Sequence, residues 1–267
     1  MTDSFYFDNS NDVKTLRCRA LDDAGFKKHC FTTRIGGVSS GYLAGTNLSF
    51  SREERENVLE NYRRVFKAVG FSGNAVLSNQ QHTDIVKFID SEYKNVGIIT
   101  ESCAVDGFVT DRHGICLVTF VADCVPVIIA DPVKNAVACV HSGWRGTAAG
   151  ITARAVQKMT EHCGSDPKDM IAAVGPCIGV CCYEVGRDVL DGFREFDSDA
   201  GRFFTEKPDG KYMLDLNGAN RAVLERAGLK SENIHISYEC TFCNSELYYS
   251  HRATKGKRGN MAAMIEI

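Results

Sequence analysis

The chain has 267 residues, of which 44% are hydrophobic and 24% are charged, and its formal net charge is −3. These values are ordinary for a globular protein that buries a large core, and a long block of Lys and Arg, which nucleic-acid phosphates require, is absent from the sequence. Disorder and general nucleic-acid binding are therefore disfavoured, while length alone permits one domain or two.

Hydrophobic periodicity predicts three helices and six strands. The first helix spans 52–69 and ends at Gly70, the second spans 147–162 with Thr147 as its cap, and the third spans 217–227 before Gly228. Strands grouped between helices favour a layered α+β fold, and the scattered prolines mark no linker, so one domain is the simplest arrangement. The predicted strands, several of them apolar at nearly every position as in strands covered on both faces, are 76–78, 85–89, 106–110, 115–121, 125–130 and 136–140.

The twelve cysteines fit either a secreted disulfide scaffold or a reducing compartment. Residues 1–10 lack the basic and apolar regions of a signal peptide, and no window approaches the roughly 18 apolar residues of a membrane span. Most cysteines lie in apolar runs such as 115–118, where a free thiol packs as a small apolar side chain. We therefore expect a cytoplasmic protein with mainly reduced thiols and no membrane association.

Three potential metal ligands lie at predicted strand ends. Cys124 follows one apolar strand, His141 ends another, and His82 lies in a polar segment between two short strands. Two imidazoles and one thiolate suit zinc, and three protein ligands leave the open position of a catalytic site. The three residues are too far apart in sequence to form a compact motif, so the fold must assemble them. Taken alone, a histidine such as His82 is more often a hydrogen-bonded structural residue.

Neighbouring residues allow more than one interpretation. Trp144, the only tryptophan, either packs in the protein or stacks on a substrate, and Thr147 opens a predicted helix whose N–H groups could hold an anion. Asp123 either orients a metal ligand or caps a turn. The short basic run Lys255, Lys257 and Arg258 is interpreted as a solvated surface.

Two further groups of cysteines are interpreted as structural. Cys240 and Cys243 have CxxC spacing, but no second CxxC is present to complete a zinc ribbon. Cys177, Cys181 and Cys182 match no common metal motif, so we expect packing or loop roles for them.

Longer motifs carry a resemblance to one family. The runs ADC at 122–124, HSGWRG at 141–146, GPCIG at 175–179 and CYEVG at 182–186 resemble the YfiH/laccase-domain family of purine nucleoside phosphorylases, once described as multicopper polyphenol oxidase-like. The resemblance covers roughly residues 25–267. It implies a single domain 1–267 with a peripheral segment 1–24, folded as an α/β sandwich with mixed sheets flanked by helices.

The resemblance also implies a function. It assigns His82, Cys124 and His141 as catalytic metal ligands for zinc, with copper as an alternative. Family members phosphorolyse adenosine, inosine, guanosine and S-methyl-5′-thioadenosine, and some deaminate adenosine. The expected partners are therefore purine nucleosides and phosphate, and the expected state is a monomer or a small homo-oligomer. The sequence departs from the family pattern at Gln81, Thr83 and His251, which bear on substrate preference.

Five residues are candidates for substrate binding. Arg34, Arg145 and Arg252 could hold phosphate through paired N–H groups. Asn47 and Gln80 could contact the ribose or the base. Each arginine, taken alone, is more often a structural or surface residue.

Three alternatives remain open. Cys124 and His141 could be the nucleophile and base of a thiol hydrolase or deamidase, because the implied fold resembles that of certain bacterial toxin deamidases, and His82 distinguishes this mechanism from a metal site. A copper-dependent polyphenol oxidase would need more histidines than the seven present, although copper in the zinc site could support a side activity. The third alternative is a non-catalytic or peptidoglycan-related role.

Overall fold

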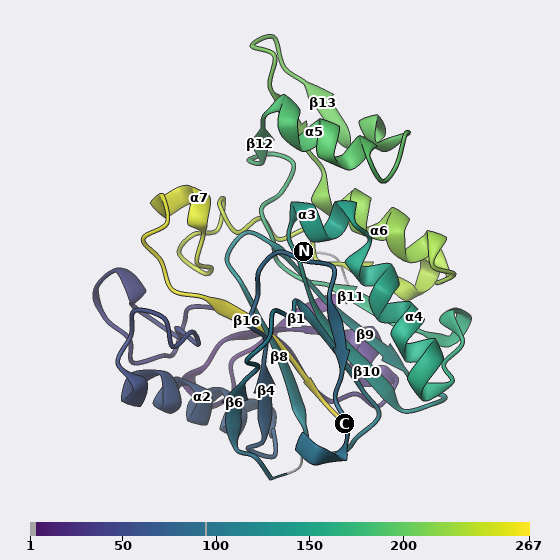
Figure 1. Cartoon of the computed structure of the whole chain (residues 1–267). Helices are drawn as coiled ribbons and strands as arrows, with labels where there is room; N and C mark the ends of the chain where they lie inside the picture. The colour runs from purple at the N-terminus through teal and green to yellow at the C-terminus, as the bar shows by residue number, and fades with distance from the viewer. Residues whose placement is uncertain (1–3, 94) are drawn as a thin grey trace.

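A computed structural model describes residues 4–93 and 95–267. Two large mixed β-sheets pack face to face, and helices cover both outer faces, as Figure 1 shows. The predicted sandwich of mixed sheets flanked by helices is confirmed. The seven-stranded sheet has the order β1 (Phe5–Asp8), β2 (Thr15–Cys18), β3 (Lys28–Thr32), β16 (Met261–Glu266), β8 (Cys116–Val121), β4 (Ala75–Leu77) and β6 (Ile98–Thr100).

The second sheet has six strands and also mixes directions. Val127 pairs with Val140 in an antiparallel ladder, whereas the edge strand runs parallel to its neighbour. Its order is β15 (Ile234–Ile236), β11 (Ile171–Val174), β9 (Val125–Asp131), β10 (Ala136–Ser142), β7 (Gly107–Thr110) and β5 (Val86–Phe88). A small third sheet, near the part of the chain that projects in Figure 1, contains β12 (Glu184–Val185), β14 (Tyr212–Leu214) and β13 (Phe204–Glu206).

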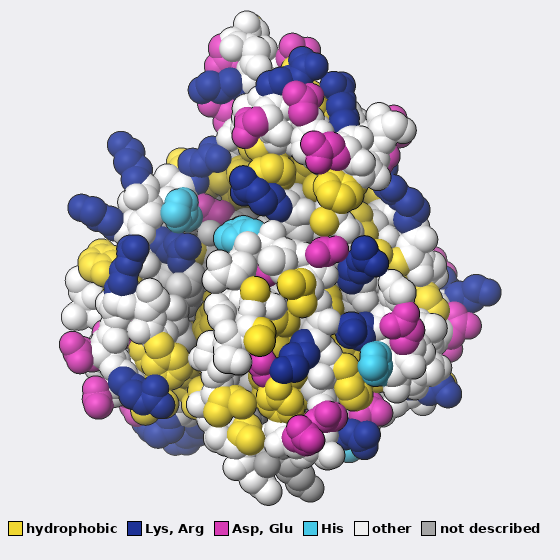
Figure 2. Space-filling model, in the orientation of Figure 1, with side chains coloured by type: hydrophobic (Ala, Val, Ile, Leu, Met, Phe, Trp, Pro, Cys, Tyr) yellow, Lys and Arg dark blue, Asp and Glu magenta, His cyan; other side chains and the backbone are white. Residues whose placement is uncertain are grey.

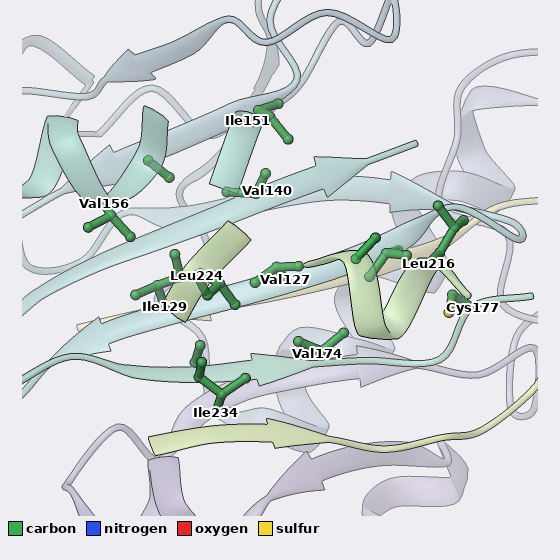
Figure 3. Packing of buried hydrophobic residues seen from close by; sticks show 14 of the residues in the cluster. Val127, Ile129, Val140, Ile151, Val156, Val174, Cys177, Leu216, Leu224 and Ile234 are labelled. Atoms are coloured by element: carbon green, nitrogen blue, oxygen red, sulfur yellow. The ribbon is translucent and has the colours of Figure 1, made fainter. Parts of the chain in front are cut away.

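The apolar strands β9 and β10 are buried along their whole lengths because both of their faces are covered. Ile128 and Cys139 point into the core between the two large sheets. Val127 and Val140 point the other way and pack in the core beneath the helices, as Figure 3 shows. The alternation of side chains along a strand explains why a continuous apolar run serves two cores.

Helices seal the two outer faces of the sandwich. Helix α2 (Arg55–Val69) packs Val58 and Val65 over the seven-stranded sheet and ends at Gly70, whose φ of 89° is left-handed. The predicted helix 147–162 is in fact two helices, α3 (Trp144–Ala148) and α4 (Ile151–Cys163), because Gly150 with φ 77° interrupts it. No helix in the described residues has the length and apolarity needed to cross a bilayer. The remaining α-helices are α1 (Arg19–Asp23), α5 (Arg187–Arg194), α6 (Leu216–Arg226) and α7 (His251–Thr254).

The two ends of the chain both contribute strands that the sequence did not predict. Strands β1 and β2 extend the edge of the seven-stranded sheet, and the side chains of Leu16 and Leu21 are fully buried in the core between the sheets. The C-terminal strand β16 lies inside that sheet, between β3 and β8. Residues 4–24, expected to be peripheral, therefore lie at a sheet edge and also fill part of the core.

Candidate metal centre

Three connections that cross from the seven-stranded sheet to the six-stranded sheet build the site. They lead from β4 to β5, from β6 to β7 and from β8 to β9, and they carry His82, Asp106 and Cys124 respectively. Strands β4, β6 and β8 run parallel, so their carboxyl ends lie at the same edge of the sheet. His141 joins them because β10 runs antiparallel to β9 and ends beside its start, where Ser142 pairs with Val125.

The predicted ligands His82, Cys124 and His141, here called the metal triad, come together. The Sγ of Cys124 lies 3.8 Å from Nε2 of His82, and one ligand atom from each of the three residues lies within 4.8 Å of the others. A tetrahedral zinc ion with ordinary bond lengths places its nitrogen and sulfur ligands about 3.6 Å apart. The donor set and its spacing therefore fit one ion of this size, with a fourth position left for another ligand.

The backbone conformation around the metal triad determines where its ligand side chains point. His82 has a left-handed φ of 60°, an uncommon conformation for a residue other than glycine. Gly143 leaves the space that the triad needs, since a Cβ there would lie 2.8 Å from Cδ2 of His82 and 3.3 Å from Sγ of Cys124. His141 is held within β10 and its side chain is only 3% exposed. The backbone conformation at His82, the space left by Gly143 and the burial of His141 thus restrict the positions of the ligand side chains.

The carboxylate of Asp106 is the supporting group that sequence analysis missed. It is fully buried, and its Oδ1 accepts hydrogen bonds from Nδ1 of His141 at 2.8 Å and from the backbone N–H of His82 at 3.1 Å. Its Oδ2 accepts from the backbone N–H groups of Gln81 and Thr83 and from the Thr83 hydroxyl. Asp106 therefore orients one ligand and fixes the loop of another, as supporting carboxylates do in metal sites. In the sequence, Asp106 stood out only as the acidic first residue of the otherwise largely apolar predicted strand 106–110.

The thiol and imidazoles perturb one another in the metal-free site. Burial alone would raise the pKa of Cys124, but the adjacent His141 and His82 lower it to about 6. Burial would lower the pKa of His141, but Cys124 and Asp106 raise it to about 9. Near neutral pH the site thus favours a thiolate beside an imidazolium, and a thiolate is the form that binds metals or attacks electrophiles.

The triad lies in the wall of a cavity of about 600 Å³, which is within the usual range for small-molecule sites. Arg52, Arg258 and His251 also line it, so three potentially cationic side chains face the same space. Figure 2 shows two histidine side chains close together on one face, with Lys and Arg side chains beside them. The interpretation of Arg258 as part of a solvated run was wrong, because it is half-buried in this cavity, whereas Lys255 and Lys257 are exposed.

The predicted substrate contacts Gln80, Asn47 and Arg34 all make internal hydrogen bonds. Gln80 lines the cavity, while its amide pairs with the backbone N–H and carbonyl of Phe120. Asn47 is fully buried, and its side chain bonds the backbone of Ser49 and Asn260. Arg34 donates to the carbonyls of Ala44 and Ser245 and does not line the cavity beside the triad.

Arg145 and Arg252 lie outside that cavity. The guanidinium of Arg252 lies over the Tyr183 ring and donates to the Glu184 carbonyl. Burial and Cys124 raise the pKa of Tyr183. The positive charges of Arg252 and Arg145 lower it by a smaller amount. Of the two arginines, Arg252 therefore packs directly against Tyr183, a partly buried ring.

The contacts of Asp123 and Trp144 favour the structural interpretation of each residue. Asp123 has a left-handed φ of 89°, and its carboxylate accepts hydrogen bonds from the Thr241 hydroxyl and the Arg252 backbone, so it braces a turn. Trp144 packs against the core beneath the helices, with Arg145 stacked on its ring at 4.2 Å. Thr147 lies within α3 rather than at its start.

Comparisons with known proteins find relatives that match nearly the whole chain. The family profile described as "Multi-copper polyphenol oxidoreductase laccase" matches residues 28–267. Purine nucleoside phosphorylase YlmD of Geobacillus stearothermophilus is 37% identical over 258 residues, which are 94% of this chain and 93% of that protein. Adenosine deaminase RL5, from an unknown prokaryotic organism, is 35% identical over 181 residues, covering 66% and 69% of the two chains. The crystal structure of Bacillus licheniformis hypothetical protein YfiH covers all of both chains with a TM-score of 0.89 and 30% identity.

Proposed function

The chain belongs to the multi-copper polyphenol oxidoreductase laccase family, and we propose that it is a zinc-dependent enzyme acting on purine nucleosides. The proposed reaction is phosphorolysis of adenosine, inosine, guanosine and S-methyl-5′-thioadenosine to the base and a pentose 1-phosphate. Adenosine deamination is proposed as a second activity, in line with the relative named adenosine deaminase. The observation that carries the proposal is the metal triad in the wall of a cavity lined by cationic side chains.

Zinc is proposed because two imidazoles and one thiolate are ligands that it commonly takes. The three side chains would hold it, with Asp106 keeping Nδ1 of His141 occupied so that Nε2 remains available. Bound there, zinc would supply Lewis acidity at its open coordination position. Copper could occupy the same donors, since divalent copper binds nitrogen and sulfur sites more tightly than zinc does.

The cavity offers groups suited to the phosphate. Arg258 is partly buried, and burial together with Arg52 lowers the pKa of its guanidinium, which nevertheless stays protonated at neutral pH. Among the described residues, none accepts a hydrogen bond from Nε of Arg258, although this atom is buried. An unpaired buried donor is costly, and a phosphate oxygen would satisfy it with a charge-assisted bond. Arg52 would add positive charge, and the imidazole of His251 could donate a hydrogen bond to the same dianion near the triad.

A thiol hydrolase or deamidase is the second candidate function, because the site contains the groups that such a mechanism needs. Cys124, His141 and Asp106 form a chain of a nucleophile, a base and an orienting carboxylate, and the pKa of the thiol is lowered to about 6. His82 distinguishes the two functions, since this mechanism does not need it. A multicopper oxidase is less well supported, because the triad is the only histidine-containing metal-ligand group found among the described residues.

The test uses the full-length protein loaded with zinc, incubated with adenosine in the presence and absence of phosphate. Chromatography separates adenine, inosine and hypoxanthine. His82→Ala is compared with wild type, and His113→Ala serves as the matched control because His113 is an exposed histidine in the turn before β8.

Phosphate-dependent adenine that disappears only in His82→Ala would support the phosphorylase, and phosphate-independent inosine would support the deaminase. The absence of every nucleoside product from protein shown to contain zinc would refute the nucleoside proposal. Hydrolysis of an amide or ester substrate that survives in His82→Ala but not in Cys124→Ala would support the thiol mechanism instead.

A further inference from the structure

Four cysteines from two distant segments of the chain meet in a cluster separate from the metal triad. Cys181 and Cys182 lie before β12, while Cys240 and Cys243 lie after β15. From the sequence, the two pairs were interpreted separately as structural residues, so their proximity was not predicted. We call these residues the four-cysteine cluster.

The spacing of the sulfur atoms matches that around a metal ion. The Sγ of Cys243 lies 3.7 Å from that of Cys181 and 3.4 Å from that of Cys182, and all four sulfur atoms lie within 4.8 Å of one another. A zinc ion with four thiolates at its usual bond length places neighbouring sulfur atoms about 3.8 Å apart. The two shorter separations are therefore close to the tetrahedral value, and the upper limit of 4.8 Å for all of them is compatible with four ligands around one ion.

The backbone around the cluster supports the same conclusion. Residue 177 pairs with residue 240 in an isolated parallel bridge, which aligns the two segments that carry the sulfur atoms. The backbone N–H of Gly179 donates to Sγ of Cys240 at 3.2 Å, a contact that would stabilise negative charge on that sulfur. A Cβ at position 179 would lie 3.2 Å from Sγ of Cys181 and from Cβ of Cys240, so glycine permits this close approach.

We propose that Cys181, Cys182, Cys240 and Cys243 bind a zinc ion as four thiolates, forming a second metal site distinct from the metal triad. Four protein ligands leave no open position, so this site is structural rather than catalytic. Soft thiolate ligands in a tetrahedral arrangement favour zinc over magnesium, calcium or manganese. The exposed positions of Cys181 and Cys243 give an ion a route of entry.

A metal explains the cluster better than a disulfide does. A disulfide between Cys182 and Cys243 would need their sulfur atoms about 2.0 Å apart and would leave Cys181 and Cys240 as unused thiols beside it. All four residues are free cysteines in the structure. One ion would use all four at their present positions.

The proposed ion would connect two segments that also support the metal triad. Thr241, next to Cys240, donates to Asp123, and the N–H of Ile178 donates to the Asp123 carbonyl. Asp123 directly precedes Cys124 in the chain. The second site would thus stiffen the turn that presents the triad's thiolate, without taking part in the reaction.

The test measures the metal content of full-length protein prepared with zinc under reducing conditions, by mass spectrometry of the elements. Wild type is expected to hold about two zinc ions per chain, Cys243→Ser about one, and His82→Ala about one. Cys103→Ser, which removes an exposed cysteine outside both sites, is the matched control and should retain two. Cys243 is itself exposed, so its substitution removes little packing.

Cobalt(II) in His82→Ala provides a second measurement that does not depend on altering the cluster. The expected spectrum has the strong visible bands and sulfur-to-metal charge-transfer bands of tetrahedral tetrathiolate cobalt. One zinc ion per wild-type chain, lost in His82→Ala and retained in Cys243→Ser, would overturn the proposal. So would a cobalt spectrum without thiolate bands, or a disulfide between Cys182 and Cys243 in protein kept under reducing conditions. Because the readouts are metal content and spectra, their failure is separate from failure of the proposed nucleoside chemistry.

Discussion

Replacing the Asp106 carboxylate by an amide tests directly whether this group orients His141 and fixes the loop that carries His82. In Asp106→Asn the side chain keeps its size, but one acceptor oxygen becomes an NH₂ donor. If that NH₂ replaces Oδ2, it faces the backbone N–H groups of Gln81 and Thr83. If it replaces Oδ1, it faces the N–H of His82 and Nδ1 of His141. Either orientation sets donors against donors.

The expected cost follows from these contacts. Two partly buried N–H groups without acceptors cost roughly 1–2 kcal/mol each, so we expect about 2–4 kcal/mol off the free energy of unfolding of the metal-free protein. His141 can relieve the second orientation only by moving its proton to Nε2, which removes a metal ligand. We therefore also expect zinc affinity at the triad to fall about 10–100-fold, as for other supporting carboxylates.

The pH dependence supplies a further readout of Asp106→Asn. Burial would raise the pKa of Asp106, but the hydrogen bonds from His141 and Thr83 lower it to about 2. A carboxyl whose pKa is lowered on folding stabilises the protein above its unfolded pKa near 4, and that contribution is lost as the pH falls from about 4 to about 2. The variant should lack this component of acid unfolding.

Urea unfolding of metal-free protein and zinc competition titrations measure the two effects. Asp131→Asn is the matched control, because Asp131 is also fully buried, yet its Oδ2 has no hydrogen-bond partner among the described residues. An NH₂ there meets no opposing donor, so the change should be about 1 kcal/mol or less, with zinc affinity unchanged. Equal destabilisation by the two substitutions, with zinc affinity kept in both, would refute the role assigned to Asp106.

Three other perturbations follow from the described contacts. In Gly143→Ala, the new Cβ would lie 2.8 Å from the His82 ring, so zinc affinity at the triad should fall at least about tenfold in competition titrations. Leu16→Ala should lower the free energy of unfolding by about 2–5 kcal/mol in urea, because the side chain is fully buried between the sheets, whereas the partly exposed Leu59→Ala should cost far less. In metal-free protein, alkylation of Cys124 by iodoacetamide, followed by peptide mass spectrometry, should accelerate as the pH rises through about 6, where its thiolate forms.

Each of these expectations has a contrary result. Unchanged zinc affinity in Gly143→Ala would mean that the triad tolerates displacement of His82. Equal effects of Leu16→Ala and Leu59→Ala would show that the N-terminal strands contribute little to the core. An alkylation midpoint for Cys124 at pH 8 or above would contradict the stabilisation of its thiolate by the two imidazoles.

Local patterns in the sequence determined part of the fold. The continuous apolar runs predicted β8, β9 and β10, because strands covered on both faces need apolar side chains at nearly every position. Apolar residues at helical spacing before Gly70 predicted α2, because a helix that covers a sheet buries only one of its faces. Predicted strand ends and family motifs together singled out His82, Cys124 and His141, since residue type and position next to a strand are visible without knowing the partners.

Only the tertiary structure determined what depends on distant partners. Strand β16 lies between β3 and β8, and such pairing leaves no periodic signal in the strand itself. Asp106 became recognisable as a support for the triad only when neighbouring crossings between the sheets placed it beside His141. The four-cysteine cluster likewise joins segments about sixty residues apart. Hydrophobic periodicity indicates whether a side chain is buried. A functional site depends instead on which side chains lie next to one another, and long-range packing determines those neighbours.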